Sequence, residues 1–179
     1  MSDPGPRLVL ITGCSGGGKS TLLAELARRG HRIVEEPGRR IVADETARGG
    51  NALPWTDLEA FLRRAVEMSI ADREAALGGN GLVFFDRGLI DAASALQALT
   101  GEPALRDLAG RHRYHRLVFI APPWPGIFRA DAERRHGYDA AVDEYERLMR
   151  DVPAVGYDAA ELPRTTPAER ADVVLAALA

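Results

Sequence analysis

Short apolar runs alternate with amphipathic stretches along most of this 179-residue chain. The apolar runs are bounded by glycine, proline or charged residues, a pattern typical of parallel strands that are buried on both faces. The stretches between them repeat apolar side chains at three- and four-residue spacing, as helices that pack against a sheet do. This order predicts a three-layer α/β fold around a mostly parallel, five-stranded sheet, in a single domain over residues 1–179.

The same pattern places each expected element. We expect strands over residues 7–12, 31–36, 81–86, 116–123 and within 156–162. We expect helices over residues 19–29, near 39–47, from 56 to about 77, and over 89–99, 102–109, 138–150 and 167–178. Thr56 and Glu59 have the spacing of a capping box at the start of the longest helix. The insertion from 37 to 81 exceeds the roughly twelve residues that a parallel crossover needs, so it can form a substrate site. Residues 1–6 are expected to be flexible.

A glycine-rich loop follows the first predicted strand. Residues 13–20, Gly-Cys-Ser-Gly-Gly-Gly-Lys-Ser, match the P-loop or Walker A pattern G-x-x-x-x-G-K-[S/T]. Glycines adopt positive φ and bring backbone N–H groups around phosphate oxygens, and the following helix adds the positive end of its dipole. The predicted nucleotide-binding residues are Gly13, Ser15, Gly16, Gly17, Gly18, Lys19, Ser20 and Thr21.

Lys19 is the only lysine among the 23 lysine and arginine residues of the chain. A compact ammonium on a flexible stem can lie between β- and γ-phosphate oxygens, where a planar guanidinium is wider. The hydroxyl of Ser20, the next residue, is of the type that ligates Mg²⁺ in this pattern. We therefore predict that this stretch binds a nucleoside triphosphate with Mg²⁺.

Charged residues also end the third predicted strand. Parallel strands place their carboxyl ends at one edge of the sheet, where α/β folds bind ligands. Asp86 is predicted to hold Mg²⁺ there, directly or through water. The alternative role of Asp86 is that of an acid at the start of the next helix. Arg87 is predicted to contact a phosphate or to pair with a nearby carboxylate.

Two adjacent acids, Glu35 and Glu36, end the second predicted strand. Neighbouring side chains of a strand diverge, so we expect only one of them to face the site. We favour Glu36, because it precedes Pro37 where the chain leaves the sheet. A carboxylate there can act as a general base toward an acceptor hydroxyl or a water, and the alternative is a solvated acid. Arg39 and Arg40, one turn further on, suit an anionic acceptor.

Residues 124–137 are charged, have little strand character and are expected to form a mobile lid. A cation that closes over the transferring phosphoryl group stabilises the charge on its oxygens. Arg134 is the preferred candidate among Arg129, Arg134 and Arg135, and the alternative is that all three are solvated.

Composition limits the partners and the compartment. A net charge of -3 argues against broad binding of nucleic acid. No apolar run reaches the roughly 18 residues of a membrane span, and the first residues do not form a signal peptide. The single cysteine, Cys14, cannot form an internal disulfide. We therefore expect a cytoplasmic protein with no nucleic-acid or membrane partner, and the sequence leaves its oligomeric state open.

The motifs together resemble the bacterial AAA-domain family of P-loop ATPases and kinases, which is related to kinases of nucleosides, nucleotides and nicotinamide riboside. The segments that carry the resemblance are GCSGGGKST, VEEPGRR, FFDRG, DAERR and GYDAAELP, at residues 13–21, 34–40, 84–88, 131–135 and 156–163. The resemblance implies a nucleotide-kinase-like fold with a lid, in which Glu36 is the acid of a Glu-Pro pair. It also implies an Asp-Arg pair at Asp86 and Arg87 and a lid Asp-x-x-Arg at Asp131 and Arg134. Asp91 recurs in the pattern of the family as well.

The predicted function is transfer of the γ-phosphoryl group of Mg-ATP to a small nucleoside- or nucleotide-like metabolite. The alternatives are an ATP-hydrolysing switch with a protein partner and, less favoured, a nucleotide-binding module without chemistry. GTP stays open as the donor, but a Ras-type GTPase is disfavoured, since its N-K-x-D motif needs a lysine after an asparagine and the single lysine, Lys19, follows Gly18. The candidate roles are catalytic for Lys19, Glu36, Asp86 and Arg134, substrate-binding for Arg39 and Arg87, and metal-binding for Ser20 and Asp86.

Overall fold

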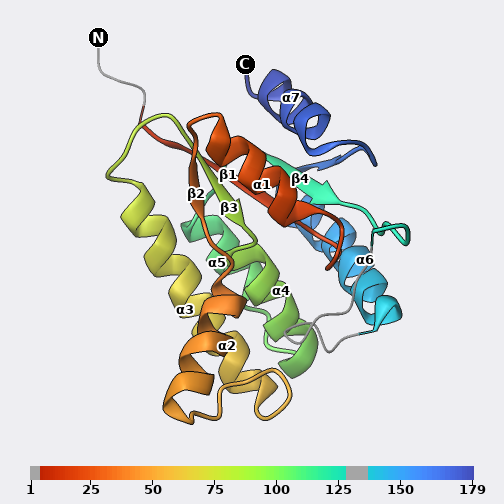
Figure 1. Ribbon diagram of the computed structural model, residues 1–179. Coiled ribbons are helices and arrows are strands. Elements are labelled where there is room, and N and C mark those ends of the chain that lie inside the picture. Colours follow the sequence, from red (N-terminus) through yellow and green to blue (C-terminus); the bar gives the residue numbers. More distant parts are fainter. Residues whose placement is uncertain (1–4, 128–136) are drawn as a thin grey trace.

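The computed structural model describes residues 5–127 and 137–179, and these form a five-stranded sheet with helices on both faces (Figure 1). Every pair of neighbouring strands is parallel, and the spatial order is β2-β3-β1-β4-β5. The strands are β1 (Arg7–Gly13), β2 (Arg32–Val34), β3 (Leu82–Asp86), β4 (Leu117–Ala121) and β5 (Asp158–Glu161). The predicted five-stranded parallel sheet is thus confirmed.

Side chains of the central strand β1 alternate between the two faces, as the pleat requires. Leu8 and Leu10 pack on one face with α4, α5 and α6, whereas Val9 and Ile11 pack on the other face with α1 and α7. The helices are α1 (Lys19–Arg28), α2 (Pro37–Arg48), α3 (Leu58–Ala76), α4 (Leu89–Thr100), α5 (Leu105–Arg111), α6 (Tyr138–Ala154) and α7 (Pro167–Ala177). The predicted three-layer α/β fold is confirmed.

The insertion between β2 and β3 folds into α2 and α3. Ile41 of α2 is fully buried against Ala65 of α3 and Ala92 of α4. The buried carboxylate of Glu45 contacts the guanidinium of Arg64 on α3 and anchors the far end of α2. Helix α2 is therefore held on α3 and α4, at the lower end of the molecule in Figure 1.

Three local predictions were wrong. Strand β2 ends at Val34, because Glu36 is already the N-cap of α2 and Pro37 its first residue. The cap of α3 is Asp57, whose carboxylate accepts the N–H of Ala60 at 2.9 Å, in place of the Thr56–Glu59 box. Helix α6 continues to Ala154, since Pro153 lies in its last turn and costs few of the helical hydrogen bonds.

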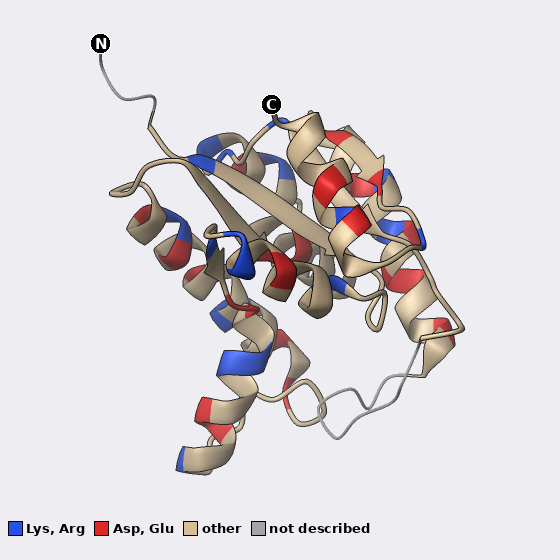
Figure 2. Ribbon diagram, turned by 45° about the horizontal axis from the view of Figure 1, so that its top comes forward, with Lys and Arg blue, Asp and Glu red and all other residues tan. Residues whose placement is uncertain are grey.

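Several predictions concern residues that lie outside the described ranges. The lid residues Arg129, Asp131, Arg134 and Arg135 fall within 128–136, and the flexible start falls largely on 1–4. Across 5–127 and 137–179, no helix is long and apolar enough to cross a membrane. Basic and acidic residues are interspersed along these helices (Figure 2), in keeping with the small net charge.

Candidate active site

Glycines shape the loop between β1 and α1. Gly13 has a φ of 109°, and a Cβ there would lie 2.4 Å from the carbonyl oxygen of Ala121 on β4. Gly18 caps α1 with a φ of 79°, and a Cβ there would lie 2.7 Å from Nη1 of Arg170. Only glycine fits either position without displacing a neighbour. The N-terminus of α1 has no side-chain cap, so its first N–H groups can bind an anion.

A cavity of about 1080 Å³ runs from this loop to the insertion. Its lining at the loop end includes Ser15, Gly16, Gly18, Lys19, Ser20 and Thr21. Its lining toward the insertion includes Glu36, Arg39, Asp86, Arg87, Asp91 and Glu144. Gly13 and Gly17 pack instead beside the end of β4, where the nearest neighbours of an added Cβ are the carbonyl oxygens of Ala121 and Pro122. The fold thus brings together the candidate residues of three separate motifs.

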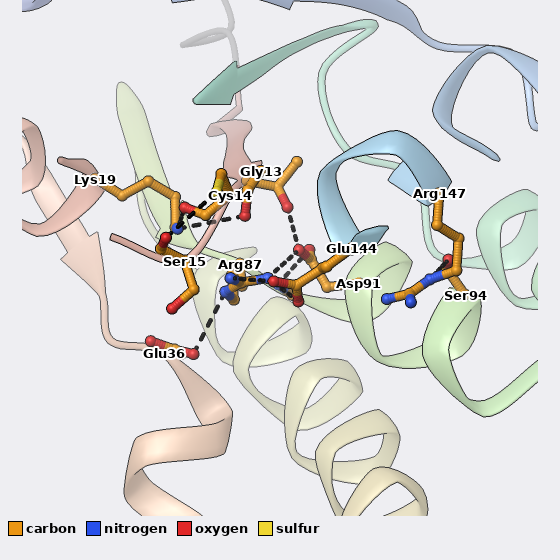
Figure 3. Close-up of polar contacts among 12 residues, drawn as sticks. Gly13, Cys14, Ser15, Lys19, Glu36, Arg87, Asp91, Ser94, Glu144 and Arg147 are labelled. Carbon is orange, nitrogen blue, oxygen red and sulfur yellow. Dashed lines mark hydrogen bonds and ion pairs between the residues drawn. The ribbon is translucent and has the colours of Figure 1, made fainter. Parts of the chain in front are cut away.

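Lys19 is buried in the loop, and its Nζ donates to the carbonyl oxygen of Cys14 at 2.9 Å (Figure 3). Burial lowers the pKa of Lys19 to about 8, and the positive charge of Arg87 adds to this effect, while Asp86 opposes it. The neighbouring groups therefore balance the positive charge of the Lys19 ammonium only in part. A bound phosphate would supply the missing negative charge.

Asp86 ends β3 beside the loop. Its Oδ1 atom is buried without a hydrogen-bond partner, and burial raises the pKa of this carboxyl above its ordinary value. A buried carboxylate oxygen without a donor is costly unless a cation or a proton reaches it. With the Ser20 hydroxyl in the same cavity, the donor set is all oxygen, which fits Mg²⁺. Within the described residues no group of three or more His, Cys, Asp or Glu could hold a metal ion.

Arg87 is held between carboxylates from three elements. Its Nη1 and Nη2 donate to the two oxygens of Glu144 on α6, at 2.7 and 3.0 Å. Glu36 lies 3.4 Å from its Nε, and Asp91 lies 3.3 Å from its Nη1. Figure 3 shows the guanidinium between Glu36 on one side and Glu144 with Asp91 on the other. Burial lowers the pKa of Arg87, but the carboxylates outweigh burial and keep the guanidinium charged. The predicted pairing of Arg87 with a nearby carboxylate is thus observed, and its contact with a phosphate stays a prediction.

The backbone of Arg87 is left-handed, with a φ of 59°, the only such non-glycine residue in the described part of the chain. Its N–H donates to the carbonyl oxygen of Ile11 at 2.9 Å, which anchors the turn to β1. A left-handed residue other than glycine costs of the order of 1 kcal/mol or more and is enriched at functional sites. The turn directs Arg87 toward α6 directly after Asp86 leaves the sheet.

Two arginines of the insertion differ in where they lie. Nε of Arg39 donates to Oε2 of Glu36 at 3.0 Å, within the cavity. Arg40 pairs with Asp72 of α3 at 2.7 Å. Glu36 lines the cavity and Glu35 is exposed, as expected from the turn at Pro37.

Asp91 accepts the N–H of Gly88 at 3.0 Å and contacts the hydroxyl of Thr12, so it joins the start of α4 to β1.

Comparison with known proteins identifies the family. Residues 8–170 match the AAA domain family. The chain belongs to this family.

A relative of this AAA domain chain, 31% identical over 163 residues, is a ribose 1,5-bisphosphate phosphokinase from Acidiphilium cryptum. The match covers 90% of the chain and 86% of that protein. A nucleotide-binding protein from Granulibacter bethesdensis is 43% identical over 54 residues, which are 30% of the chain and 17% of that protein. The chain thus spans a small part of the second relative and most of the first.

Solved structures show the fold of this AAA domain to be that of P-loop kinases. Deoxyadenosine kinase from M. mycoides with bound dATP superposes with a TM-score of 0.65 at 15% identity, over 96% of the chain and 98% of the kinase. A NadR protein in complex with NR gives 0.72 at 20%, over 94% of the chain but only 50% of NadR. Thymidylate kinase from Ehrlichia chaffeensis gives 0.61 at 17%, over 98% and 100%. The chain thus has the fold of P-loop kinases over nearly its whole length.

Two residues of the AAA domain site belong to no recognisable sequence motif. Glu144 lies on α6, and only the amphipathic pattern of that helix marks the region. Arg170 on α7 is 1% exposed, and its Nη1 donates to the carbonyl oxygens of Gly17 and Gly18 at 2.9 and 3.2 Å. Its Nε donates to the carbonyl oxygen of Pro163 at 2.8 Å. Arg170 thereby holds the glycine loop in place from α7.

Replacing Arg170 with methionine is expected to weaken nucleotide binding about tenfold, with a smaller effect on the maximal rate. Two loop carbonyls lose their donor, and an unsatisfied buried group costs about 1–3 kcal/mol. Titration of the nucleotide and steady-state kinetics measure the two effects separately. The matched control is Arg164→Met, because Arg164 is exposed and donates to the carbonyl oxygen of Pro123, outside the loop. Equal nucleotide affinities of the two variants would contradict a role of Arg170 in holding the loop.

Proposed function

We propose that this chain transfers the γ-phosphoryl group of Mg-ATP to a hydroxyl group of a small metabolite. The observation that carries the proposal is the unpartnered Oδ1 of Asp86 beside the buried ammonium of Lys19, in a cavity that continues to Glu36 and the insertion. A nucleotide switch needs only the loop end of this cavity. The phosphokinase relative, whose named substrate is a small sugar bisphosphate, also supports a metabolite as acceptor.

The residues have distinct roles in the proposal. The loop N–H groups and Lys19 bind the β- and γ-phosphates, and Ser20 and Asp86 hold Mg²⁺. When bound, Mg²⁺ neutralises charge that develops on the phosphate oxygens. Glu36 accepts the proton of the acceptor hydroxyl, and Arg39 and Arg87 fix the position of its carboxylate. A cation from Arg134, which lies outside the described residues, stays a prediction, as does the choice of ATP over GTP.

The proposal is tested by measuring ATP turnover together with phosphorylated product, with and without a panel of nucleosides, nucleotides and sugars. We expect one acceptor class to stimulate turnover and to appear as a phosphorylated product in equal amount. Slow hydrolysis that every acceptor leaves unchanged would favour the alternative of an ATP-hydrolysing switch.

ATP binding is expected to take up a proton above about pH 8. The free site lowers the pKa of Lys19 to about 8, whereas bound phosphates favour the ammonium and raise that pKa again. Between these two values the complex holds more protons than the free protein, so affinity falls with rising pH, by up to about tenfold per pH unit. Calorimetry in two buffers of different ionisation enthalpy, at about pH 6.5 and about pH 9, measures the uptake. Lys19→Met should abolish it, and zero uptake by the unmodified protein at about pH 9 would contradict the assignment.

A further inference from the structure

The cavity changes character beyond Glu36 and Asp86. There its lining includes Val42, Phe61, Leu62, Ala95, Leu99 and Ala140, which come from α2, α3, α4 and α6. Such a lining binds the apolar or aromatic face of a ligand and offers few hydrogen-bond partners. The half of the cavity that would receive the acceptor therefore offers an apolar surface beside its charged residues.

An aromatic ring and the proposed base meet at Gly38. A Cβ added to Gly38 would lie 3.2 Å from Cζ of Phe61 and 3.7 Å from Oε1 of Glu36. The φ of Gly38 is not positive, so its backbone conformation does not require glycine. What glycine contributes at this position is the absence of a side chain. A larger residue at this position would crowd the ring of Phe61, so glycine keeps the aromatic face and the carboxylate of Glu36 accessible side by side.

The charges of this half disfavour an anionic acceptor. Arg87 is held by Glu144 through two hydrogen bonds and also faces Glu36, and Arg39 donates to Glu36. A phosphate that recruited Arg87 would leave the carboxylate of Glu144 without its partner in a buried site, which is strongly unfavourable. The described charged residues that line the cavity next to this apolar surface are the acids Glu36, Asp86, Asp91 and Glu144 and the bases Arg39, Arg87 and Arg147. Arg147 donates to the hydroxyl of Ser94 at 3.0 Å (Figure 3).

The rim of this half exposes large apolar side chains. Leu99 of α4 is 47% exposed and Leu58 of α3 is 39% exposed, and both line the cavity. Exposed leucines beside a cavity lose contact with water when an apolar ligand covers them, which favours binding.

We propose that the acceptor is an uncharged molecule that carries its hydroxyl group on an apolar, ring-containing body, and that it bears no phosphate. This inference rests on the proposed function and narrows its substrate. The acceptor oxygen forms a bond to the γ-phosphorus, the bond from that phosphorus to the β-phosphate oxygen breaks, ADP leaves, and the hydroxyl proton passes to Glu36. The acceptor would thus differ from the bisphosphate named for the Acidiphilium cryptum relative.

Matched pairs of acceptors test the inference. Nucleosides are compared with their 5′-monophosphates, and ribose with ribose 5-phosphate, by transfer of labelled γ-phosphate from Mg-ATP. We expect kcat/KM for the nucleosides to exceed that for their monophosphates by about tenfold or more. Preference for the monophosphates or for ribose 5-phosphate would overturn the inference and leave the proposed function standing. Hydrolysis without any phosphorylated product would overturn both.

Two leucine variants give a second, independent test. Leu99→Asp places a charge on the rim, and Leu77→Asp places the same charge on a leucine that is 44% exposed at the C-terminal end of α3, outside the cavity lining. For Leu99→Asp we expect a rise of about tenfold in the KM of the best nucleoside, since it removes about one leucine of apolar contact, with an unchanged KM for ATP. Leu77→Asp should leave both values unchanged. An unchanged acceptor KM in Leu99→Asp would overturn the apolar assignment.

Discussion

Replacing Lys19 with methionine is expected to lower phosphoryl transfer by about 10²–10³-fold, the usual effect of removing one preorganised donor from a developing charge. Among the described residues the ammonium has only carbonyl oxygens as hydrogen-bond acceptors, so its positive charge is available to a phosphate. Methionine keeps the length of the side chain and removes the buried charge. The melting temperature should therefore stay the same or rise, because burial disfavours the ammonium in the free protein.

The comparison variant is Lys19→Arg, which keeps the charge in a wider, planar group. We expect it to be nearly as inactive as Lys19→Met, because a planar guanidinium does not reproduce the contact of Nζ with the carbonyl oxygen of Cys14 or a compact charge between phosphate oxygens. Steady-state turnover and thermal unfolding measure the two effects. Turnover within a few-fold of the unmodified protein in Lys19→Met would refute the assignment of the loop as the phosphate site.

Replacing Glu36 with glutamine is expected to lower kcat by about 10²–10⁴-fold, the range for losing a general base, and to leave the KM for ATP unchanged. Glutamine keeps the shape and still accepts a hydrogen bond from Arg39 through its amide oxygen. It lacks the basicity to take a hydroxyl proton. Kinetics with the best acceptor, at saturating ATP, provide the measurement.

The neighbouring acid offers the control. Glu35→Gln removes the same charge one residue earlier, on an exposed side chain that is not part of the cavity lining. It should retain nearly full activity. If both variants lose activity equally, the effect is general electrostatics, and Glu36 is not the base.

The apolar runs were sufficient to locate β1, β3 and β4, because buried parallel strands need branched and aromatic side chains on both faces, as in Val83 and Phe84 of β3. The edge strands β2 and β5 have no fully buried residue, and the sequence signal for β5, Asp-Ala-Ala-Glu, was weak. Local ambiguity explains the errors at element ends. Thr56 and Asp57 are adjacent, both residue types cap helices, and the turn before α3 selects the second. In the same way, Glu36 before Pro37 is typical of the end of a strand, but a proline also fits the first turn of a helix, as it does in α2.

Site residues could be predicted from the sequence where they lie together in one contiguous segment. The glycine loop is contiguous, so its residues follow from spacing alone. The partner of Arg87 was left open, since a guanidinium after a strand can face a ligand or a carboxylate. Only the packing of α6 brings Glu144 to it. Arg170 lies 153 residues after Gly17, and no local pattern indicates that contact.

The contact of Arg170 with the glycine loop also affects the order in which the chain folds during synthesis. The first strand, its loop and α1 are synthesised early, whereas α7 forms from the last described segment of the chain. Nη1 of Arg170 reaches the loop only when α7 has packed against α1, next to Leu22 and Leu26. The glycine loop thus gains this support only after α7 has been synthesised and has packed. A ribosome-bound chain that stops before Arg170 carries the complete phosphate-binding motif but lacks the support that holds it ready for a nucleotide.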